Sequence, residues 1–235
     1  LDQLLDPNRI VNLIRIRDGA RLTEIQKSLI EAGFSEVEIE AGFKSVKVKP
    51  PFSAKKLEGL LYPAFYPKSS KDNAASIIQY MADRFQASTK EINWSFGKFT
   101  PEQLLTIASL VESEGIPQVF AKVARVVYNR LEMGMPLQFD STIHYIFDRR
   151  GELPLSTKDT KTSSPYNTFM NRGLPPGPIV SPTIAAIEAT LNPADGPWLY
   201  FVTVLPKQTK FTADYKEFLD FKAEYKRNFA SGEFE

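Results

Sequence analysis

The sequence predicts an α+β fold in which a small strand and helix module precedes a mainly helical domain with a small sheet and long, cleft-forming loops. A strand is expected over residues 10–17, where Ile14 and Ile16 alternate with Arg15 and Arg17 as in a half-buried strand, and Asp18-Gly19 then turns the chain. From residue 74 onward the apolar residues mostly follow helical spacing, and one apolar run at 198–205 has the length of a strand. Few strands beside many helices indicate the α+β class.

The N-terminal module is expected to consist of this strand and two short helices. A helix is expected over 22–32, where apolar residues recur at intervals of three and four, and Gly33 stands where a left-handed helix end is common. A second helix is expected over 36–43. The stretch 46–52 holds two lysines and two consecutive prolines, which predicts an exposed, extended connection. Its lysines indicate either a solvated strand face or a lysine-rich groove.

Five further helices and one buried strand are expected after this connection. Prolines at 101 and 117 suit the first helical turn, and glycines at 115 and 134 suit helix ends. The expected helices are 74–86, 101–114, 117–133, 182–191 and 215–229, and the expected strand is 198–205.

Residues 136–179 lack helical or strand periodicity and are rich in Ser, Thr, Asn, Pro and Gly. A loop region of this length inside a compact domain is usually functional or disordered. Its aromatic residues, among them Phe139, Tyr145 and Tyr166, argue against disorder. We therefore expect an ordered array of loops that lines a cleft.

The composition excludes several kinds of functional site. The 235 residues carry 29 Lys+Arg and 28 Asp+Glu, a net charge of +1, so we predict no nucleic-acid partner. Cysteine is absent, which excludes disulfides, thiolate metal sites and a cysteine nucleophile. His144 is the only histidine, so a site with several histidine ligands is excluded as well. We predict no metal and no cofactor, which leaves carboxylates, hydroxyls and amides for the chemistry.

The sequence contains no apolar run of the ~18 residues that are needed to span a bilayer. It begins at Leu1 rather than at an initiator Met, which predicts that an upstream segment was removed. A membrane anchor or signal in such a segment would leave no trace in these residues.

Glu112 falls on the apolar side of the helix that is expected to end at Glu114. At 100° per residue it lies about 80° from Leu104, inside the apolar arc, and Glu114 lies on the opposite flank. Apolar surroundings disfavour a charged carboxyl and should raise its pKa, which suits an acid that protonates a leaving group. The residue types support equally well a structural ion pair of Glu112 with Arg125 or Arg130.

Several short strings occur in an order that resembles one enzyme family. They are LEGLLYPAFY at 57–66, ASLVESEG at 108–115, VARVVYNRLEMGMPLQFDSTIHY at 123–145, SPYNTF at 164–169 and GLPPGPIVSP at 173–182. Their order resembles the YceG-like, or MltG-type, family of endolytic murein transglycosylases. The family's pattern includes A-S-I-V-E-x-E, N-R-L-x-x-G-M-x-L-Q-x-D-x-T, P-Y-N-T and G-L-P-P-G-x-I.

The resemblance implies an enzyme that cleaves the MurNAc-β-1,4-GlcNAc bond of nascent peptidoglycan strands and leaves 1,6-anhydro-MurNAc ends. It implies a LysM-like module over 1–67 and a YceG-like catalytic domain over 68–235. It also implies a location on the extracytoplasmic face of the bacterial cell membrane, with a single-pass N-terminal anchor that these residues do not contain. Peptidoglycan strands are the expected partners, and cell-wall synthesis proteins at the membrane are further candidates.

In this resemblance Glu112 takes the position of the catalytic glutamate and is expected to act as general acid and base. The expected substrate-binding residues are Glu114, Gln138, Asp140, Thr142, Tyr166, Asn167 and Thr168. Neutral amides and hydroxyls suit the N-acetyl and hydroxyl groups of sugars, and a role in loop architecture is the alternative for each. The family often has histidines where this chain has Lys210-Phe211 and Glu217-Phe218, so no role for those histidines is expected here.

Two functional alternatives stay open at this point. One is a non-catalytic peptidoglycan-binding module, and the other is a water-using muramidase on the same cleft. A single acid serves either cleavage chemistry, so the sequence does not separate transglycosylation from hydrolysis.

Overall fold

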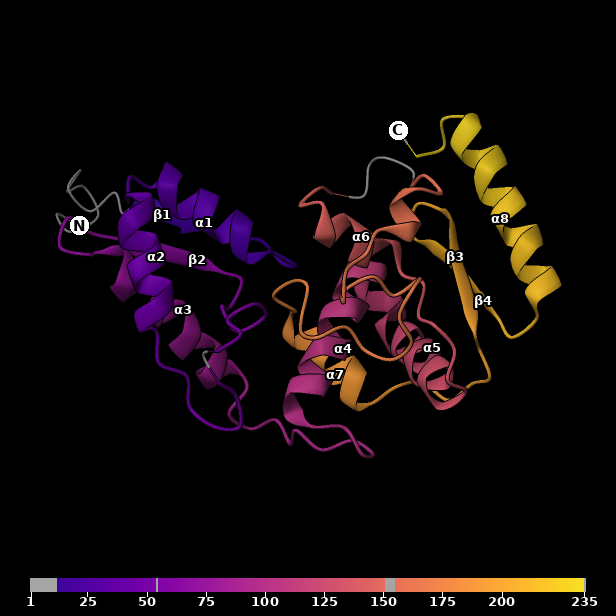
Figure 1. The fold of residues 1–235 in the computed structure, drawn as a ribbon, viewed down its shortest axis with the longest axis horizontal. Coiled ribbons are helices and arrows are strands. Elements are labelled where there is room, and N and C mark those ends of the chain that lie inside the picture. The colour runs from indigo at the N-terminus through magenta and orange to yellow at the C-terminus, as the bar shows by residue number, and fades with distance from the viewer. Residues whose placement is uncertain (1–11, 54, 151–154, 235) are drawn as a thin grey trace, which may run out of the picture. The chain divides into compact units, whose positions relative to one another are not determined.

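The computed structural model describes residues 12–53, 55–150 and 155–234 (Figure 1). It divides into two compact units. The first runs to Trp94 and includes the later segment Ile179–Ile184, and the second comprises Ser95–Pro178 and the chain from Ala185 onward. The predicted α+β class is confirmed, because the described residues form eight α-helices and two small antiparallel sheets.

The first unit combines a two-stranded sheet with three helices. Its elements are β1 (Asn12–Arg15), α1 (Leu22–Glu31), α2 (Glu36–Ser45), β2 (Phe65–Lys68) and α3 (Ala74–Ser88). The two strands are antiparallel, with Arg15 opposite Phe65. Strand β2 was not expected. It contains Pro67, which is unfavourable inside a sheet, and the two-stranded sheet tolerates this proline because each strand is an edge.

Local side-chain contacts define where the helices of the first unit begin and end. Ser35 and Glu38 form a reciprocal capping box at the start of α2. Asn73 accepts a hydrogen bond from the Ser76 amide, 2.9 Å away, at the start of α3. Gly33 follows α1 with a φ of 91°, which confirms the predicted left-handed helix end.

Helix α3 belongs to the first unit because it packs closely on α2. A Cβ atom at Gly42 of α2 would lie 2.7 Å from Ile78 and 3.1 Å from the backbone of Ala75, both on α3. Phe52 also contacts Trp94, with 4.8 Å between the ring centroids. The first compact unit therefore extends past residue 67, where the LysM-like module was expected to end. The assignment of residues 1–67 to such a module and of 68–235 to a catalytic domain stays a prediction.

The segment Ile179–Ile184 joins the first unit through the turn after β1. The Ser181 amide donates to the Ala20 carbonyl at 2.7 Å, and the Gly19 amide donates to the Ser181 carbonyl at 3.2 Å. The string GLPPGPIVSP thus ends on the first unit, although it begins on the second.

The second unit is built on helix α4, which begins and ends at the predicted residues. Every residue from Leu104 to Val111 is buried. The buried hydroxyls of Thr106 and Ser109 donate to the carbonyls of Glu102 and Thr106, which satisfies both donors within the helix. The elements of the unit are α4 (Pro101–Glu114), η3 (Pro117–Val119), α5 (Phe120–Glu132), α6 (Asp140–Ile146), η4 (Asp159–Lys161), α7 (Ile184–Leu191), β3 (Tyr200–Leu205), β4 (Gln208–Thr212) and α8 (Tyr215–Ala230).

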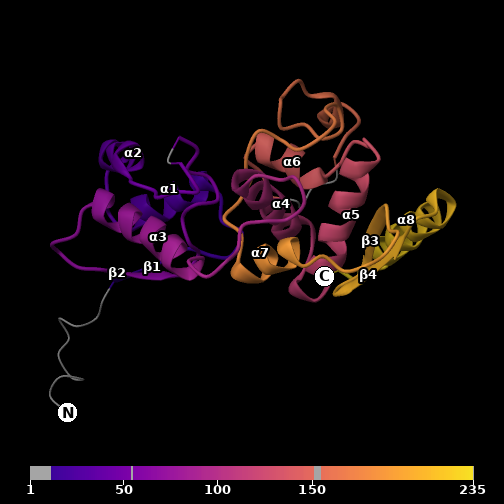
Figure 2. The same cartoon turned by 90° about the horizontal axis from the view of Figure 1, so that it is seen from below.

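Strands β3 and β4 form an antiparallel hairpin, and α8 covers one of its faces, as Figures 1 and 2 both show. The Asn228 side chain of α8 donates to the Val204 carbonyl at 2.7 Å, and Glu224 pairs with Lys210 at 2.8 Å. Within the described residues no helix is both long and apolar enough to cross a membrane.

Several expectations about the elements of the second unit need correction. The strand expected to be buried over 198–205 is β3, and of its residues only Val204 is buried. The helix expected over 117–133 begins with a 3₁₀ turn, and the helix expected over 182–191 begins at Ile184. Residues 136–179 are not only loops, because they contain the seven-residue helix α6. Helix α6 was missed because its apolar residues are too few to show helical periodicity.

Candidate active site

The acidic end of α4 carries Glu112 and Glu114, two of the residues that the sequence indicates for the chemistry. Both are half-buried in the last turn of the helix. Arg125 and Arg130, the two expected ion-pair partners of Glu112, bind elsewhere in the described part of the chain. Arg125 pairs with Asp195, and Arg130 donates to backbone carbonyls. The ion pairs and hydrogen bonds described for these two arginines do not include Glu112.

Glu114 contacts the start of α6. Its Oε1 accepts a hydrogen bond from the Ser141 amide, 3.2 Å away. Burial raises the pKa of Glu114 to about 7, and the negative charge of Asp140 adds to the rise. Hydrogen bonds from Ser141 and the positive charge of Arg130 oppose it. At neutral pH this carboxyl can both donate and accept a proton.

The segment before α6 is held in a turn by Thr168. Gln138 has a φ of 52°, an uncommon conformation for a residue with a side chain, and its amide donates to the Thr168 carbonyl at 3.0 Å. The Phe139 amide donates to Thr168 Oγ1 at 2.9 Å, and Thr142 Oγ1 lies 3.0 Å from the same oxygen. These bonds join the string around residues 138–142 to the string around residues 166–168.

Of the expected substrate-binding residues, Gln138 and Asp140 are exposed. They flank the buried Phe139, so both lie on the outer side of the turn. Partial burial raises the pKa of Asp140, and the positive charge of Lys222 opposes the rise. Tyr166 is half-buried, and its ring centroid lies 5.0 Å from that of Tyr145.

The other three expected substrate-binding residues, Thr142, Asn167 and Thr168, are buried. Asn167 Nδ2 donates to the carbonyls of Thr160 and Thr162, at 3.1 and 2.7 Å, and its Oδ1 accepts from the Phe169 amide at 2.9 Å. Thr142 and Thr168 bond to each other and to the turn. The side chains thus hold the loops together, and direct contact of these three with a sugar stays a prediction.

Ser141 was not expected at the site, and Arg130 was expected there only as an alternative ion-pair partner of Glu112, although its position indicates a buried charge. Arg130 follows Val127 by three positions and Val123 by seven, which places it on the apolar face of α5. A charged residue on an apolar helix face is buried, and a buried charge needs fixed partners. Ser141 acts through its backbone amide, for which no sequence signal exists.

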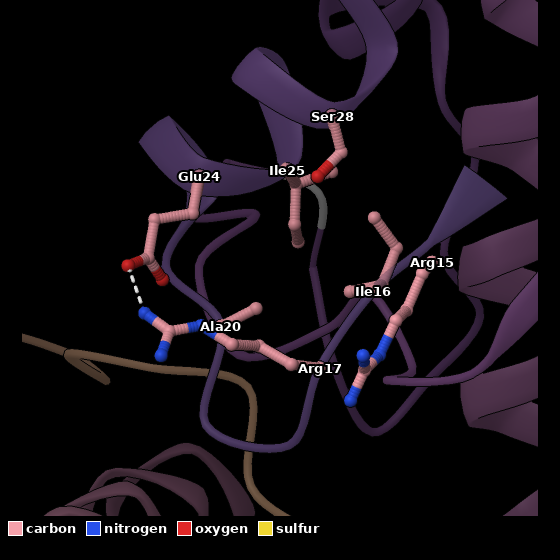
Figure 3. Close-up of a pocket in the computed structure, with 7 residues that line it drawn as sticks. All are labelled: Arg15, Ile16, Arg17, Ala20, Glu24, Ile25 and Ser28. Carbon is pink, nitrogen blue, oxygen red and sulfur yellow. Dashed lines mark hydrogen bonds and ion pairs between the residues drawn. The ribbon is translucent and has the colours of Figure 1, made fainter. Parts of the chain in front are cut away.

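A separate pocket of about 270 Å³ lies in the first unit, between β1 and α1 (Figure 3). Its floor is apolar, with Ile16 and Ile25 both buried. Arg17 forms an ion pair with Glu24 at the rim. Arg15 is exposed, and its guanidinium carbon lies 5.8 Å from the centroid of the Phe65 ring. The residues that line the pocket are Arg15, Ile16, Arg17, Ala20, Glu24, Ile25 and Ser28.

Comparison with known proteins finds relatives in sequence and in fold. Residues 1–224 match the model of the YceG-like family. An endolytic murein transglycosylase of Bacillus subtilis is 37% identical over 173 residues, which cover 72% of this chain and 48% of the relative. An endolytic murein transglycosylase of Streptococcus pneumoniae is 37% identical over 172 residues, which cover 69% of this chain and 31% of the relative. The chain thus spans about half or less of the length of these relatives.

A solved structure has a similar fold. It is the crystal structure of a yceG-like protein of Listeria monocytogenes, with a TM-score of 0.73 and 26% sequence identity. The similarity covers 88% of this chain and 75% of that one. Sequence and fold therefore agree on the same group of proteins.

Proposed function

The chain belongs to the YceG-like family, whose model matches residues 1–224, and from that membership we propose that it is the peptidoglycan-cleaving part of an endolytic murein transglycosylase. Its substrate in this proposal is the MurNAc-β-1,4-GlcNAc bond of nascent glycan strands. The identity of 37% to two proteins that carry this name supports the proposal.

One structural observation supports the proposal most directly. The hydrogen bond between Glu114 and Ser141 connects the acidic end of α4 to the turn that exposes Gln138 and Asp140. Two residues that lie 27 positions apart, in separate strings of the sequence, thus meet in one compact unit. The result is a group of carboxylates beside exposed amide and carboxylate side chains, as a sugar-cleaving site requires.

In the proposed mechanism Glu112 acts as general acid and then as general base. It first donates its proton to O4 of GlcNAc while the bond from O4 to C1 of MurNAc breaks. The 6-hydroxyl of the same MurNAc attacks C1, and its proton passes to the Glu112 carboxylate. A C1–O6 bond replaces the C1–O4 bond, no water is consumed, and Glu112 ends protonated for the next turnover.

The surrounding residues have two kinds of role in this proposal. Gln138, Asp140 and Tyr166, which are at least partly exposed, are proposed to contact the sugar rings directly. The buried Thr142, Asn167 and Thr168 are proposed to fix the loops from which those side chains extend. Glu114 is proposed to hold α6 against α4, and its pKa of about 7 makes it the second candidate for proton transfer.

The N-terminal part is proposed to bind glycan strands as a LysM-like module and to take no part in bond cleavage. The pocket between β1 and α1, with Arg15 at its rim, is the feature of the first unit that supports a binding role. The proposed location is the extracytoplasmic face of the bacterial membrane, with an N-terminal anchor outside these residues. Proteins of cell-wall synthesis are proposed as partners there.

Digestion of purified glycan strands in H₂¹⁸O tests the proposed reaction. We expect new 1,6-anhydro ends without ¹⁸O, because the attacking oxygen comes from the sugar itself. A water-using muramidase would instead place one ¹⁸O in every new reducing end. A non-catalytic binding module would release no fragments at all, and either result would contradict the proposal.

A further inference from the structure

Arg130 is a buried cation whose hydrogen bonds in the described structure all go to backbone carbonyls. Its side chain lies near the end of α5, and the residue is 6% exposed. Nε donates to the Leu199 carbonyl at 2.6 Å. Nη1 donates to the carbonyls of Leu137 and Pro136, at 2.5 and 3.4 Å. A buried guanidinium needs such acceptors, because leaving its charge without partners is costly.

The carbonyls that Arg130 binds belong to two segments that border the candidate active site. Pro136 and Leu137 directly precede the exposed Gln138, and Leu199 directly precedes β3. The guanidinium also lies over the Tyr200 ring, 5.2 Å from its centroid. One side chain therefore joins α5, the turn before α6 and the start of the hairpin.

The turn between Arg130 and Thr168 is fixed at both ends. Arg130 binds the carbonyl of Leu137, and Thr168 binds the amides of the next two residues, Gln138 and Phe139. Gln138 is thereby held at a positive φ, which a residue with a side chain adopts only when its surroundings enforce it. Losing the Arg130 anchor should allow this turn to relax.

The charge of Arg130 also acts on the acidic end of α4. It lowers the pKa of Glu114, and the charge of Glu114 in turn raises that of Arg130. The other groups that act on Glu114 are Asp140, which raises its pKa, and Ser141, which lowers it through hydrogen bonds. Of the groups that act on the pKa of Glu114, Arg130 is the one that carries a positive charge.

We propose that Arg130 is a positioning residue of the active site: by tying Leu137 and Leu199 to α5, it presents Gln138 and Asp140 beside the acidic end of α4. It touches no reacting atom in this account. The inference rests on the proposed function for its kinetic consequences, whereas its effect on Glu114 does not depend on the reaction.

Two variants of Arg130 separate its anchoring from its charge. Arg130→Met keeps most of the length of the side chain but removes every hydrogen bond and the charge. Arg130→Lys keeps the charge, but its single ammonium group cannot replace the planar guanidinium, whose separate N–H groups bind carbonyls from two segments. Arg125→Met is the matched control, since Arg125 lies one turn earlier on α5 and donates to the nearby Ala194 carbonyl at 2.6 Å.

The experiment measures kcat, KM and the ¹³C titration of the Glu114 carboxyl, with the signal assigned by its loss in Glu114→Gln. We expect kcat of both Arg130 variants to fall about 10- to 100-fold on glycan strands, because a misplaced site loses rate at saturating substrate. We expect the Glu114 titration midpoint to rise in Arg130→Met and to stay near its wild-type value in Arg130→Lys. Arg125→Met should change neither kcat nor the titration.

The outcomes distinguish this inference from the proposed function. A wild-type protein that releases no anhydro ends contradicts the proposed function, while the Glu114 titration in Arg130→Met still tests the influence of Arg130. Arg130 variants that are folded and keep the wild-type kcat contradict the positioning role. Should Arg130→Met fail to fold, Arg130→Lys with a normal titration and a wild-type kcat would overturn it equally.

Discussion

The Glu114 carboxylate accepts a hydrogen bond from the Ser141 amide, 3.2 Å away, and so connects the last turn of α4 to the first turn of α6. The two residues belong to separate sequence strings, ASLVESEG and the string that contains L-Q-F-D-S-T. Glu114 is thus a structural link, and its burial raises the pKa of this carboxyl from its ordinary value of 4.5 to about 7. Changes to this link and to the turn beside it should therefore alter both the stability and the activity of the protein.

The raised pKa of Glu114 should make the protein less stable as pH rises. The folded state binds the proton of the Glu114 carboxyl more tightly than the unfolded state does. The stabilisation from this proton is therefore complete below about pH 4.5 and is lost as pH rises through about 7. The loss is on the order of 3 kcal/mol at pH 8. Glu114→Gln cannot ionise and should gain stability relative to wild type between pH 5 and pH 8.

Thermal melts of both proteins at pH 5 and pH 8 measure this effect. Exposed Glu188 provides the control, and Glu188→Gln should follow wild type at both pH values. An equal difference between Glu114→Gln and wild type at the two pH values would contradict the raised pKa.

The hydroxyl of Thr168 should contribute to stability and activity together. Thr168→Val keeps the shape of the side chain but leaves the buried Phe139 amide without its acceptor. An unsatisfied buried donor costs about 1–3 kcal/mol. We expect this loss in chemical denaturation and a lower kcat, because the turn that carries Gln138 loosens. Thr168→Ser retains the hydroxyl and should recover most of the lost stability; if it does not, the methyl group rather than the hydroxyl is responsible.

Gly196 should tolerate no side chain, because the Trp198 ring lies against its backbone. A Cβ atom at this position would lie 2.5 Å from the ring, and the ring is itself in contact with Phe211 and Lys122. We expect Gly196→Ala to cost about 1–3 kcal/mol, as overpacking does.

Gly173 offers a comparison for this substitution. A Cβ atom there meets nothing within 4 Å, although its φ of 83° makes alanine strained. Gly173→Ala should therefore lose only the backbone contribution of about 1 kcal/mol. Denaturation midpoints in which Gly196→Ala equals wild type would show that the Trp198 ring moves aside freely.

Arg15 should contribute to the binding of glycan strands. It is exposed at the rim of the pocket between β1 and α1 and has no carboxylate partner among the described residues. We expect Arg15→Ser to weaken the sedimentation of the protein with purified sacculi about fivefold in Kd, which corresponds to the loss of about 1 kcal/mol. The exposed Lys90 lies in the same unit, and Lys90→Ser should bind as wild type does. Equal binding by both variants would remove the pocket from glycan recognition.

The helices could be predicted well from the sequence because their signals are local. Helix α4 begins at Pro101 behind the Thr100 cap and ends before Gly115, as the residue types indicate. Strand β2 and helix α6 could not be predicted in this way. The pairing of β2 with β1 joins residues about 50 positions apart, and α6 is a short helix whose first turn is held by Glu114 from another element.

The residues of the candidate site could be predicted from the sequence. Which of them are exposed and which hold the loops together could not. The resemblance indicated Gln138, Asn167 and Thr168 alike as substrate-binding, whereas the structure exposes Gln138 and buries the other two in loop contacts. Burial of a polar side chain depends on tertiary contacts that a string does not show. For the same reason, the position of Arg130 on the apolar face of α5 predicts that it is buried but does not predict that it binds carbonyls from two separate segments.

The proposed reaction depends on proton transfer by Glu112. The rate of anhydro-end formation by Glu112→Gln, measured by mass spectrometry on purified glycan strands, tests this role. An amide keeps the shape of the side chain but cannot transfer a proton, so we expect a loss of about 100- to 10,000-fold. Glu114→Gln, two residues away in the same helical turn, is the matched variant and should retain more of the rate than Glu112→Gln. A Glu112→Gln protein that keeps half of the wild-type rate, or a Glu114→Gln protein that loses the rate in its place, would contradict the assignment.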